Sequence, residues 1–579
     1  MITKINHILF ILLALISSRV MSQESSRMKN DTIATETTYI VKPYSPKISD
    51  AFKVKEIPSI SDDLALKRKS IKYNIFSIPV ASTFVPAKTL ASSIEKSAPL
   101  RLFDNYVSAG VGSYTSFLAE LYLNHAINNN ETIGSSLSHQ SSEGGIDGSI
   151  VDNNFLDTNF KGYYLKKQSD YALKIEFGVA YEMFNWYGVP ENQFEDTVLQ
   201  SLEPKQYFID FDLGAHIDFE NKAFNSGSIL FSRLIDAFES HENRLQLNSN
   251  INFQLQKGVV NTTFKLDYLD GEFQRSLFND ESINYSNFQF GVIPNYEIKK
   301  SNLILNLGVS AYYLNDLNLG KNKFYIFPKI TMQYSIVDDV LLAYGGIEGN
   351  LIQNTFDVFR QQNPFMSPTL SIIPTDQQYD VYAGLKGRLA QALSYHVKAV
   401  YKAENNSPLI KSNPLQLGET KSYQYGYSFG VVYDDLKMFS LFGELNMGVS
   451  DKFNLGMTAE YITYAIDTES EAWNRPNFEA SLLMNLQFND RWYAGANLFY
   501  TGKRKDEIYI IDPLVMTTTR TIALQSYLDA NMYVGFHVND LWSVFMKANN
   551  ITNQNYDRWM NYQVQGFQVL AGTTFKFDF

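Results

Sequence analysis

Hydrophobic and polar residues alternate with a period of two along most of the chain after Asp104. The stretch YALKIEFGVAYEM, which begins at Tyr171, places aromatic and aliphatic side chains on one face and residues such as Lys174 and Glu176 on the other. A period of two predicts an extended strand. Strands of soluble proteins usually have about 5–6 residues, whereas a strand that crosses a bilayer needs about 9–11. The stretch therefore predicts a membrane-spanning strand.

The last residues of the chain, VLAGTTFKFDF (569–579), repeat this alternation and end on an aromatic residue. A final strand built from them turns Phe575, Phe577 and Phe579 to one face and Lys576 and Asp578 to the other. We expect the phenylalanines to face lipid and the charged residues to face the lumen of a barrel.

Turn signals between the alternating segments are of two kinds. Short ones stand at 167–170, 257–258, 299–301, 337–339, 450–451, 489–490 and 539–540. Long, irregular ones stand at 187–204, 270–283, 350–378, 404–436, 503–518 and 552–565. Short turns on one side and long loops on the other are typical of outer-membrane barrels.

These segments predict an all-β fold, a transmembrane antiparallel β-barrel of about 22 strands that spans 104–579. SFGVVYDDL (428–436) is interpreted as part of a long loop, because an extra strand would give an odd total and misplace the C-terminus. A soluble β-sandwich would also alternate, but the strand number and the one-sided long loops disfavour it.

The five tryptophans also fit two aromatic girdles at the membrane interfaces. Trp186, Trp473 and Trp559 fall where predicted strands meet long loops, and Trp492 and Trp542 follow short turns. None falls in the middle of a predicted strand.

The first part of the chain differs from the rest. Residues 1–22, with Lys4 before an apolar stretch at 8–16, predict a secretory signal peptide. Residues 23–103 are rich in Ser, Thr, Lys and Pro and predict an extended periplasmic or lumenal N-terminal arm without a globular plug. The sequence has no cysteine, and its net charge of -12 disfavours nucleic acid as a partner.

The C-terminal segment KANNITNQNYDRWMNYQVQGFQVLAGTTFKFDF (547–579) resembles the end of TonB-dependent outer-membrane receptors. The matching pieces are Asn550 to Asn553, Tyr556, Gly566 and Phe579. The segment 327–350 is similar to a mid-barrel hairpin of that family, and the style of the sequence is similar to members from the Bacteroidota. The resemblance covers the barrel. It implies the cell outer membrane, with outer-membrane lipid, the barrel-assembly machinery, TonB and a surface lipoprotein as candidate partners, and Phe575, Phe577 and Phe579 as the C-terminal barrel-assembly signal.

The departure from this family lies before the first strand. Such receptors carry a plug of roughly 130 residues inside the barrel, whereas 23–103 is shorter and has no globular pattern. We expect the arm, inward-folded loops or another protein to fill the opening. In the arm, Glu36, Thr37, Thr38, Tyr39, Ile40 and Val41 loosely resemble a TonB box, which pairs by its edge with the periplasmic energising protein. The other interpretation is an ordinary Thr- and Val-rich arm.

Enzymatic constellations are not recognisable in the sequence, so we expect no catalytic residue, no cofactor and no metal. The histidines after the signal peptide, at positions 125, 139, 216, 241, 396 and 537, have no paired spacing. The 350–378 loop combines Phe356, Phe359 and Phe365 with Asp357 and Arg360, a mixture that suits sugars, peptides or a protein partner. The alternative is a loop that packs on its own apolar residues.

Two functions follow from these features. The first is a TonB-dependent receptor-like barrel that takes up a nutrient across the outer membrane, which the family resemblance favours. The second is a non-transporting barrel that scaffolds an outer-membrane protein complex for assembly or secretion, which the missing plug favours. The sequence names no substrate.

Overall fold

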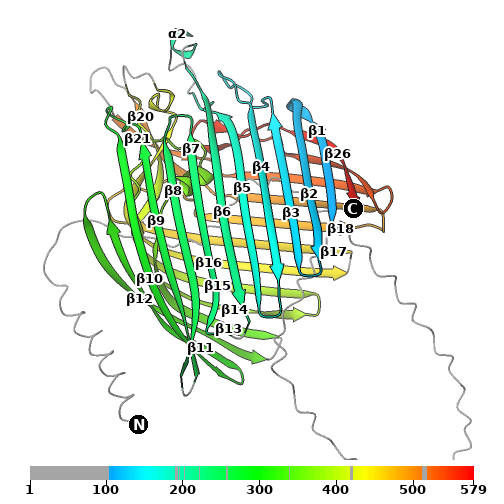
Figure 1. Cartoon of the computed structure of the whole chain (residues 1–579). Coiled ribbons are helices and arrows are strands. Elements are labelled where there is room, and N and C mark those ends of the chain that lie inside the picture. The colour runs from blue at the N-terminus through cyan, green and yellow to red at the C-terminus, as the bar shows by residue number, and fades with distance from the viewer. Residues whose placement is uncertain are drawn as a thin grey trace, which may run out of the picture. The chain divides into compact units, whose positions relative to one another are not determined.

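The computed structural model describes residues 103–579, apart from 190–193, 195, 201, 221, 256–257, 338–339, 417–420, 451 and 511–517. This part of the chain forms a closed antiparallel β-barrel of 22 strands (Figure 1). The first strand, β1 (Asn105–Gly112), pairs with β2 (Ser116–Asn128) on one side and with the last strand, β26 (Gln568–Phe577), on the other. The predicted all-β barrel of about 22 strands is confirmed.

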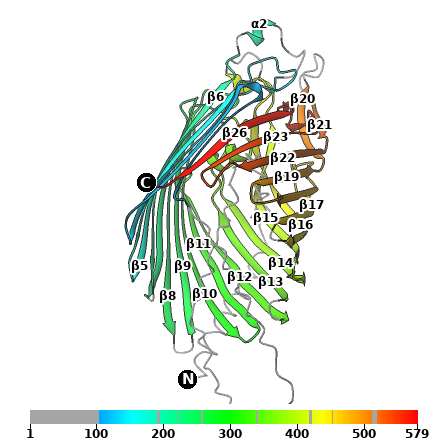
Figure 2. The same cartoon turned by 90° about the vertical axis from the view of Figure 1, so that its right-hand side faces the viewer.

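The remaining barrel strands follow one another around the wall (Figure 2). They are β3 (Glu131–Ser142), β4 (Phe155–Lys167), β5 (Tyr171–Asn185), β6 (Lys205–Phe219), β7 (Phe224–Asp236), β8 (His241–Leu255), β9 (Gly258–Phe273), β10 (Ile283–Lys300), β11 (Leu303–Asp316), β12 (Lys321–Val337), β13 (Leu341–Ile352), β14 (Thr375–Ala390), β15 (Leu393–Ser412), β16 (Phe429–Ser450), β17 (Phe453–Ile466), β18 (Phe478–Gln487), β19 (Trp492–Thr501), β22 (Tyr527–His537) and β23 (Trp542–Asn549). Two hairpins, β20 (Arg504–Ile510) with β21 (Thr518–Leu524) and β24 (Asp557–Trp559) with β25 (Tyr562–Gln563), lie outside this sheet. The short helices are η1 (Ser113–Thr115), α2 (Asp196–Leu199), α3 (Phe356–Gln362) and η2 (Ser422–Gln424).

The outer face of the barrel is apolar, as the alternation requires. On β5, Ile175, Phe177 and Val179 are 41%, 43% and 41% exposed, and they face away from the lumen. Such apolar residues recur on successive strands around the wall. A closed barrel with an even number of strands and an apolar outer band is the architecture of the bacterial outer membrane. The protein is therefore an outer-membrane barrel.

The final strand has the orientation that the sequence predicted, but it is shorter. Phe575 lies opposite Trp542, which is 44% exposed on the outer face, and their ring centroids are 4.7 Å apart. Thr574, on the other face, is buried. The strand ends at Phe577, and Phe579 follows it with 83% of its surface exposed. The role of these phenylalanines as an assembly signal stays a prediction.

We expect the substitution Phe579→Ala to lower the amount of folded barrel in the outer membrane several-fold. A recognition strand docks by its edge and by its exposed side chains, and Phe579 is the most exposed of these. The folded fraction is measured by the shift in electrophoretic mobility on heating. Phe567→Ala, which removes an exposed phenylalanine outside the strand, is the control. Equal amounts of folded protein for both variants would contradict a signal at the terminus.

The pattern of short turns and long loops is confirmed, with three corrections. The region 404–436 was expected to be a loop, but β15 continues to Ser412 and β16 begins at Phe429. The stretch 428–436 thus neither forms a loop nor adds a strand, because it extends β16 beyond its membrane-spanning part. The regions 503–518 and 552–565 were also expected to be irregular, but the first contains β20 and the second contains the hairpin of β24 and β25.

The interpretation of the tryptophans as girdle residues is correct for two of the five. Trp492 and Trp542 are 46% and 44% exposed on the outer face, directly after short turns. Trp186 and Trp473 are each only 1% exposed, and Trp559 packs against Phe429. Long-loop segments bury Trp186 and Trp473 and partly bury Trp559, so the interface interpretation is wrong for these three.

The signal peptide (1–22), the arm up to Leu102 and the segment from Glu36 to Val41 lie outside the described residues. Their assignments remain predictions.

Candidate functional site

The most elaborate arrangement of side chains is made by residues 353–374, which connect β13 to β14 and which we call the closing loop. The loop turns into the barrel at the end that carries the long loops, and it contains the helix α3. Thr355 begins this helix, because its side chain accepts a hydrogen bond from the backbone N–H of Val358 at 3.0 Å.

The start of α3 is fixed to the barrel wall by Glu242, a lumen-facing residue of β8. The two carboxylate oxygens of Glu242 accept hydrogen bonds from the backbone N–H groups of Phe356 at 2.7 Å and Asp357 at 3.1 Å. Tyr285 on β10 donates its hydroxyl proton to the same carboxylate at 2.8 Å. A carboxylate at this position satisfies N–H groups that have no partner within the helix.

Arg360 lies one turn further along α3, and its buried side chain contacts the barrel wall at β5 and β6. Its guanidinium donates to Glu182 on β5 at 3.0 Å and to Asp210 on β6, and it forms an ion pair with Asp357 at 2.7 Å. Its side chain is only 3% exposed. The guanidinium carbon also lies 4.7 Å from the ring centroid of Phe208. Burial lowers the pKa of Arg360, but the three carboxylates raise it further, and the net shift is upward.

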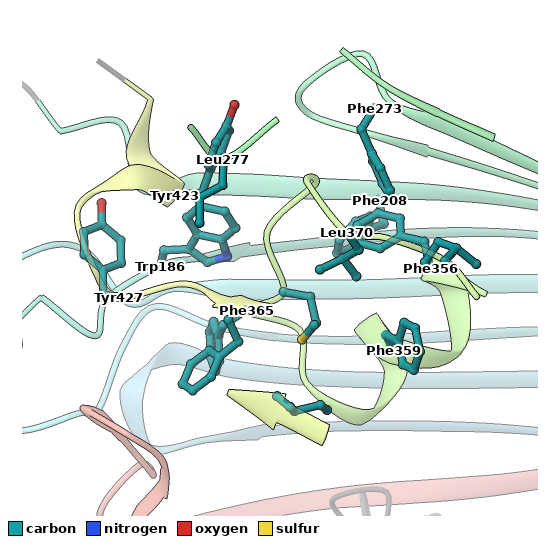
Figure 3. Packing of buried hydrophobic residues seen from close by; sticks show 14 of the residues in the cluster. Trp186, Phe208, Phe273, Leu277, Phe356, Phe359, Phe365, Leu370, Tyr423 and Tyr427 are labelled. Atoms are coloured by element: carbon teal, nitrogen blue, oxygen red, sulfur yellow. The ribbon is translucent and has the colours of Figure 1, made fainter. Parts of the chain in front are cut away.

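Aromatic residues fill the space between the closing loop and the wall (Figure 3). Phe356 contacts Phe208 and Phe273 with centroid distances of 5.9 and 5.0 Å. Phe365 stacks on Tyr562 of β25 at 3.5 Å. We call this cluster, which also holds buried residues of other long loops such as Trp186, Tyr423 and Tyr427, the loop core.

Backbone hydrogen bonds connect the closing loop to the start of β16. The N–H of Ser367 donates to the carbonyl of Phe429 at 2.8 Å, and the N–H of Phe429 donates to the carbonyl of Phe365 at 3.0 Å. Met366 and Phe429 form an isolated parallel bridge. The closing loop is therefore held by backbone hydrogen bonds, by ion pairs and by apolar packing.

The lumenal wall nearer the short turns is polar. Lys329 on β12 forms an ion pair with Glu348 on β13 at 3.6 Å, and Tyr382 on β14 donates to Glu348 at 2.7 Å. Lys398 on β15 lies 4.8 Å from the ring centroid of Tyr382. A solute that moves through this part of the barrel meets hydrogen-bonding and charged groups. Within the described residues, no group of His, Asp and Glu is arranged to hold a metal ion.

The structure decides between the two interpretations of the 350–378 loop. Phe356, Phe359 and Phe365 are 2%, 1% and 7% exposed, so they pack inside the protein and are not free to contact a ligand. The loop residues do come together as a unit, and the unit docks against the inner wall of the barrel. Sequence reasoning missed Asp210 and Glu242, which stand on the wall far from the loop in sequence. The available signal was that both are acidic residues at lumen-facing positions of predicted strands. The loop contains one arginine, which needs acidic partners when it is buried.

Substitution of Glu242, the wall residue that binds the start of α3, tests how firmly the closing loop is docked. Glu242→Ala leaves two backbone N–H groups and the hydroxyl of Tyr285 without this acceptor, at a cost of about 1–3 kcal/mol for each buried group that stays unpaired. We expect faster cleavage of the closing loop by added protease, measured on the folded barrel. Glu176→Ala removes a lumenal carboxylate that is 48% exposed and does not contact the loop, and it serves as control. Equal cleavage of both variants would contradict the role of Glu242.

Comparison with known proteins supports the fold. No family model matches the chain, and no curated protein matches it. Among solved structures, the barrel is similar to the FrpB iron transporter from Neisseria meningitidis (TM-score 0.62, 10% identity, 82% of this chain and 81% of that chain). It is also similar to the ferric-catecholate import receptor Fiu from E. coli K12 (0.59, 10%, 82% and 82%) and to the ferripyoverdine receptor of Pseudomonas aeruginosa (0.59, 13%, 83% and 73%).

At these identities the likeness concerns the fold alone. The chain has the barrel architecture of outer-membrane import receptors.

Proposed function

We propose that the protein is a TonB-dependent receptor-like barrel that takes up a nutrient across the outer membrane, with its outer end closed by its own loop. The observation that carries this proposal is the attachment of the closing loop. Arg360 of the loop donates hydrogen bonds to lumenal carboxylates, and Glu242 of the wall accepts hydrogen bonds from the loop backbone; such polar contacts re-form after the loop has moved. A closed outer end above a polar lumen is what a gated uptake barrel requires.

The energy source and the substrate are parts of the same proposal. The segment from Glu36 to Val41 serves as the contact for TonB, by adding a strand to its partner. The polar wall around Glu348 and Lys398 favours a hydrophilic solute over an apolar one. The import receptors that share the fold support uptake as the general activity. A surface lipoprotein and the barrel-assembly machinery remain candidate partners, and no catalytic role is proposed.

A second function has its own supporting observation. The loop core is as well buried as the interior of a soluble protein, with Tyr423, Phe429 and Tyr562 at or below 1% exposure. An outer end that is packed in this way suits a permanently closed barrel that scaffolds other outer-membrane or periplasmic proteins. In this alternative, TonB has no role.

Purification from the native outer membrane in a gentle detergent distinguishes the two functions. For uptake, we expect the tagged barrel alone, or with a surface lipoprotein and TonB, when stoichiometric partners are identified by mass. A variant that lacks residues 36–41 is expected to lose TonB and to keep the lipoprotein. Recovery in a large assembly that is unchanged by this deletion would contradict uptake and support the scaffold.

A further inference from the structure

The lipid-facing side of the barrel has a groove of about 460 Å³ across strands β6 to β9. Its floor is formed by small residues, Ala215, Gly227 and Ser249. Its sides are formed by larger apolar residues, among them Ile217, Phe264 and Leu266. We call this feature the acyl groove.

The strand register explains the groove. Ile217, Gly227, Ser249 and Phe264 are successive partners in one row across β6, β7, β8 and β9, and all four point outward. In neighbouring rows the outward positions carry large side chains such as Ile229, which is 44% exposed. Because the two central residues of this row are small, the apolar surface is hollowed between Ile217 and Phe264.

The groove opens in the half of the membrane next to the short turns. Phe224 lines it and is the first residue of β7, directly after the turn that follows β6. Short turns lie on the periplasmic side of such barrels, so the groove faces the inner leaflet. At this depth the surroundings are hydrocarbon, and an apolar chain is the matching occupant.

The lysine side chain of Lys222 lies near the end of the groove that Phe224 lines. Lys222, in the turn after β6, has its ammonium group 4.7 Å from the ring centroid of Phe219, and Phe219 contacts Phe224 at 5.6 Å. The ammonium group also pairs with Asp170 at 2.9 Å, and its side chain is 47% exposed. An ammonium group has three donors, so donors remain for a second anion beside Asp170.

We propose that the acyl groove and Lys222 bind one phospholipid of the inner leaflet. An acyl chain lies along the small residues of the floor, and the phosphate group contacts Lys222. The chain is already in hydrocarbon, so its preference for the groove comes from van der Waals packing against these residues together with the contact between the phosphate group and Lys222. The site makes no use of the lumen and is independent of uptake.

Native mass spectrometry of the delipidated full-length protein in detergent tests the proposal, with palmitoyl-oleoyl phosphatidylethanolamine as the probe. We expect one bound lipid to saturate before others add. Gly227→Leu is expected to lower this first occupancy about tenfold, because a Cβ atom there lies 2.8 Å from the Phe224 ring, so the added side chain displaces this ring and both occupy the groove. Gly443→Leu is the matched control, because a Cβ atom at this lipid-facing glycine of β16 has no neighbour within 4 Å.

The headgroup contact has its own pair of variants. Lys222→Glu is expected to weaken binding of the first lipid, whereas Lys452→Glu, in another short turn, is expected to leave it unchanged. Folding is checked by the mobility shift on heating, and Ser249→Leu replaces Gly227→Leu if the latter does not fold. Equal lipid occupancy in the Gly227 and Gly443 variants would overturn the proposal and leave only non-selective boundary lipid.

Discussion

Removal of the closing loop is expected to turn a barrel with little ion flow into a wide pore. A barrel of this strand number has a lumen that side chains alone do not fill. In the structure the closing loop occupies the outer end, with α3 fixed to β5, β6 and β8. Replacement of 354–373 by a short Gly-Ser linker should therefore raise the conductance in a planar bilayer roughly tenfold or more.

The measurement needs two backgrounds and a control. The deletion is made in the full chain and in a chain without residues 23–102, so that the effect of the arm is counted separately. A linker of the same composition inserted at 317–320, the connection between β11 and β12, controls for loop replacement in general. Unchanged conductance in the arm-less background would contradict closure by this loop.

Arg360→Met is expected to release the closing loop without removing it. The substitution leaves Glu182, Asp210 and Asp357 close together without the cation that joins them. Loss of one partner of a buried ion pair typically costs about 3–5 kcal/mol, which is large compared with the stability of one docked loop. We expect protease cleavage within the closing loop and intermittent channel openings at voltages where the unmodified barrel is silent.

Compensating changes separate this electrostatic effect from a loss of packing. If repulsion among the carboxylates causes the release, adding Glu182→Gln and Asp210→Asn to the Arg360→Met variant should restore most of the protection. Arg388→Met removes an exposed lumenal arginine of β14 and should have no effect. Full protection of the Arg360→Met loop would show that apolar packing alone holds it.

The barrel itself was predictable, because its signal is local and repeated. The alternation around Phe177 or Phe575 reports directly which face meets lipid, and the short turns report where strands end. The strand total was correct although 428–436 was assigned to a loop, because this stretch lengthens β16 and adds no new strand. The part of β16 beyond the membrane meets protein on both faces, so its pattern carries no lipid signal.

The site was predictable only in its composition. The sequence identified the combination of Phe356, Phe359 and Arg360, and it left open whether these side chains bind a partner or pack within the protein. Their destination depends on Glu242 and Asp210, which are more than a hundred residues away in the chain and ordinary in a polar lumen. Trp186 shows the same limit, because a tryptophan at a strand end suits a membrane interface and a loop core equally well.

Docking of the closing loop is tested most directly by a disulfide between this loop and the start of β16 in the native outer membrane. Met366 and Phe429 are bridge partners, and the native chain has no cysteine, so Met366→Cys with Phe429→Cys places the only two thiols at a distance suited to a bond. We expect nearly complete disulfide formation in whole cells, with none in either single variant. Two free, reactive thiols in the double variant would mean that the loop does not close the barrel in the membrane.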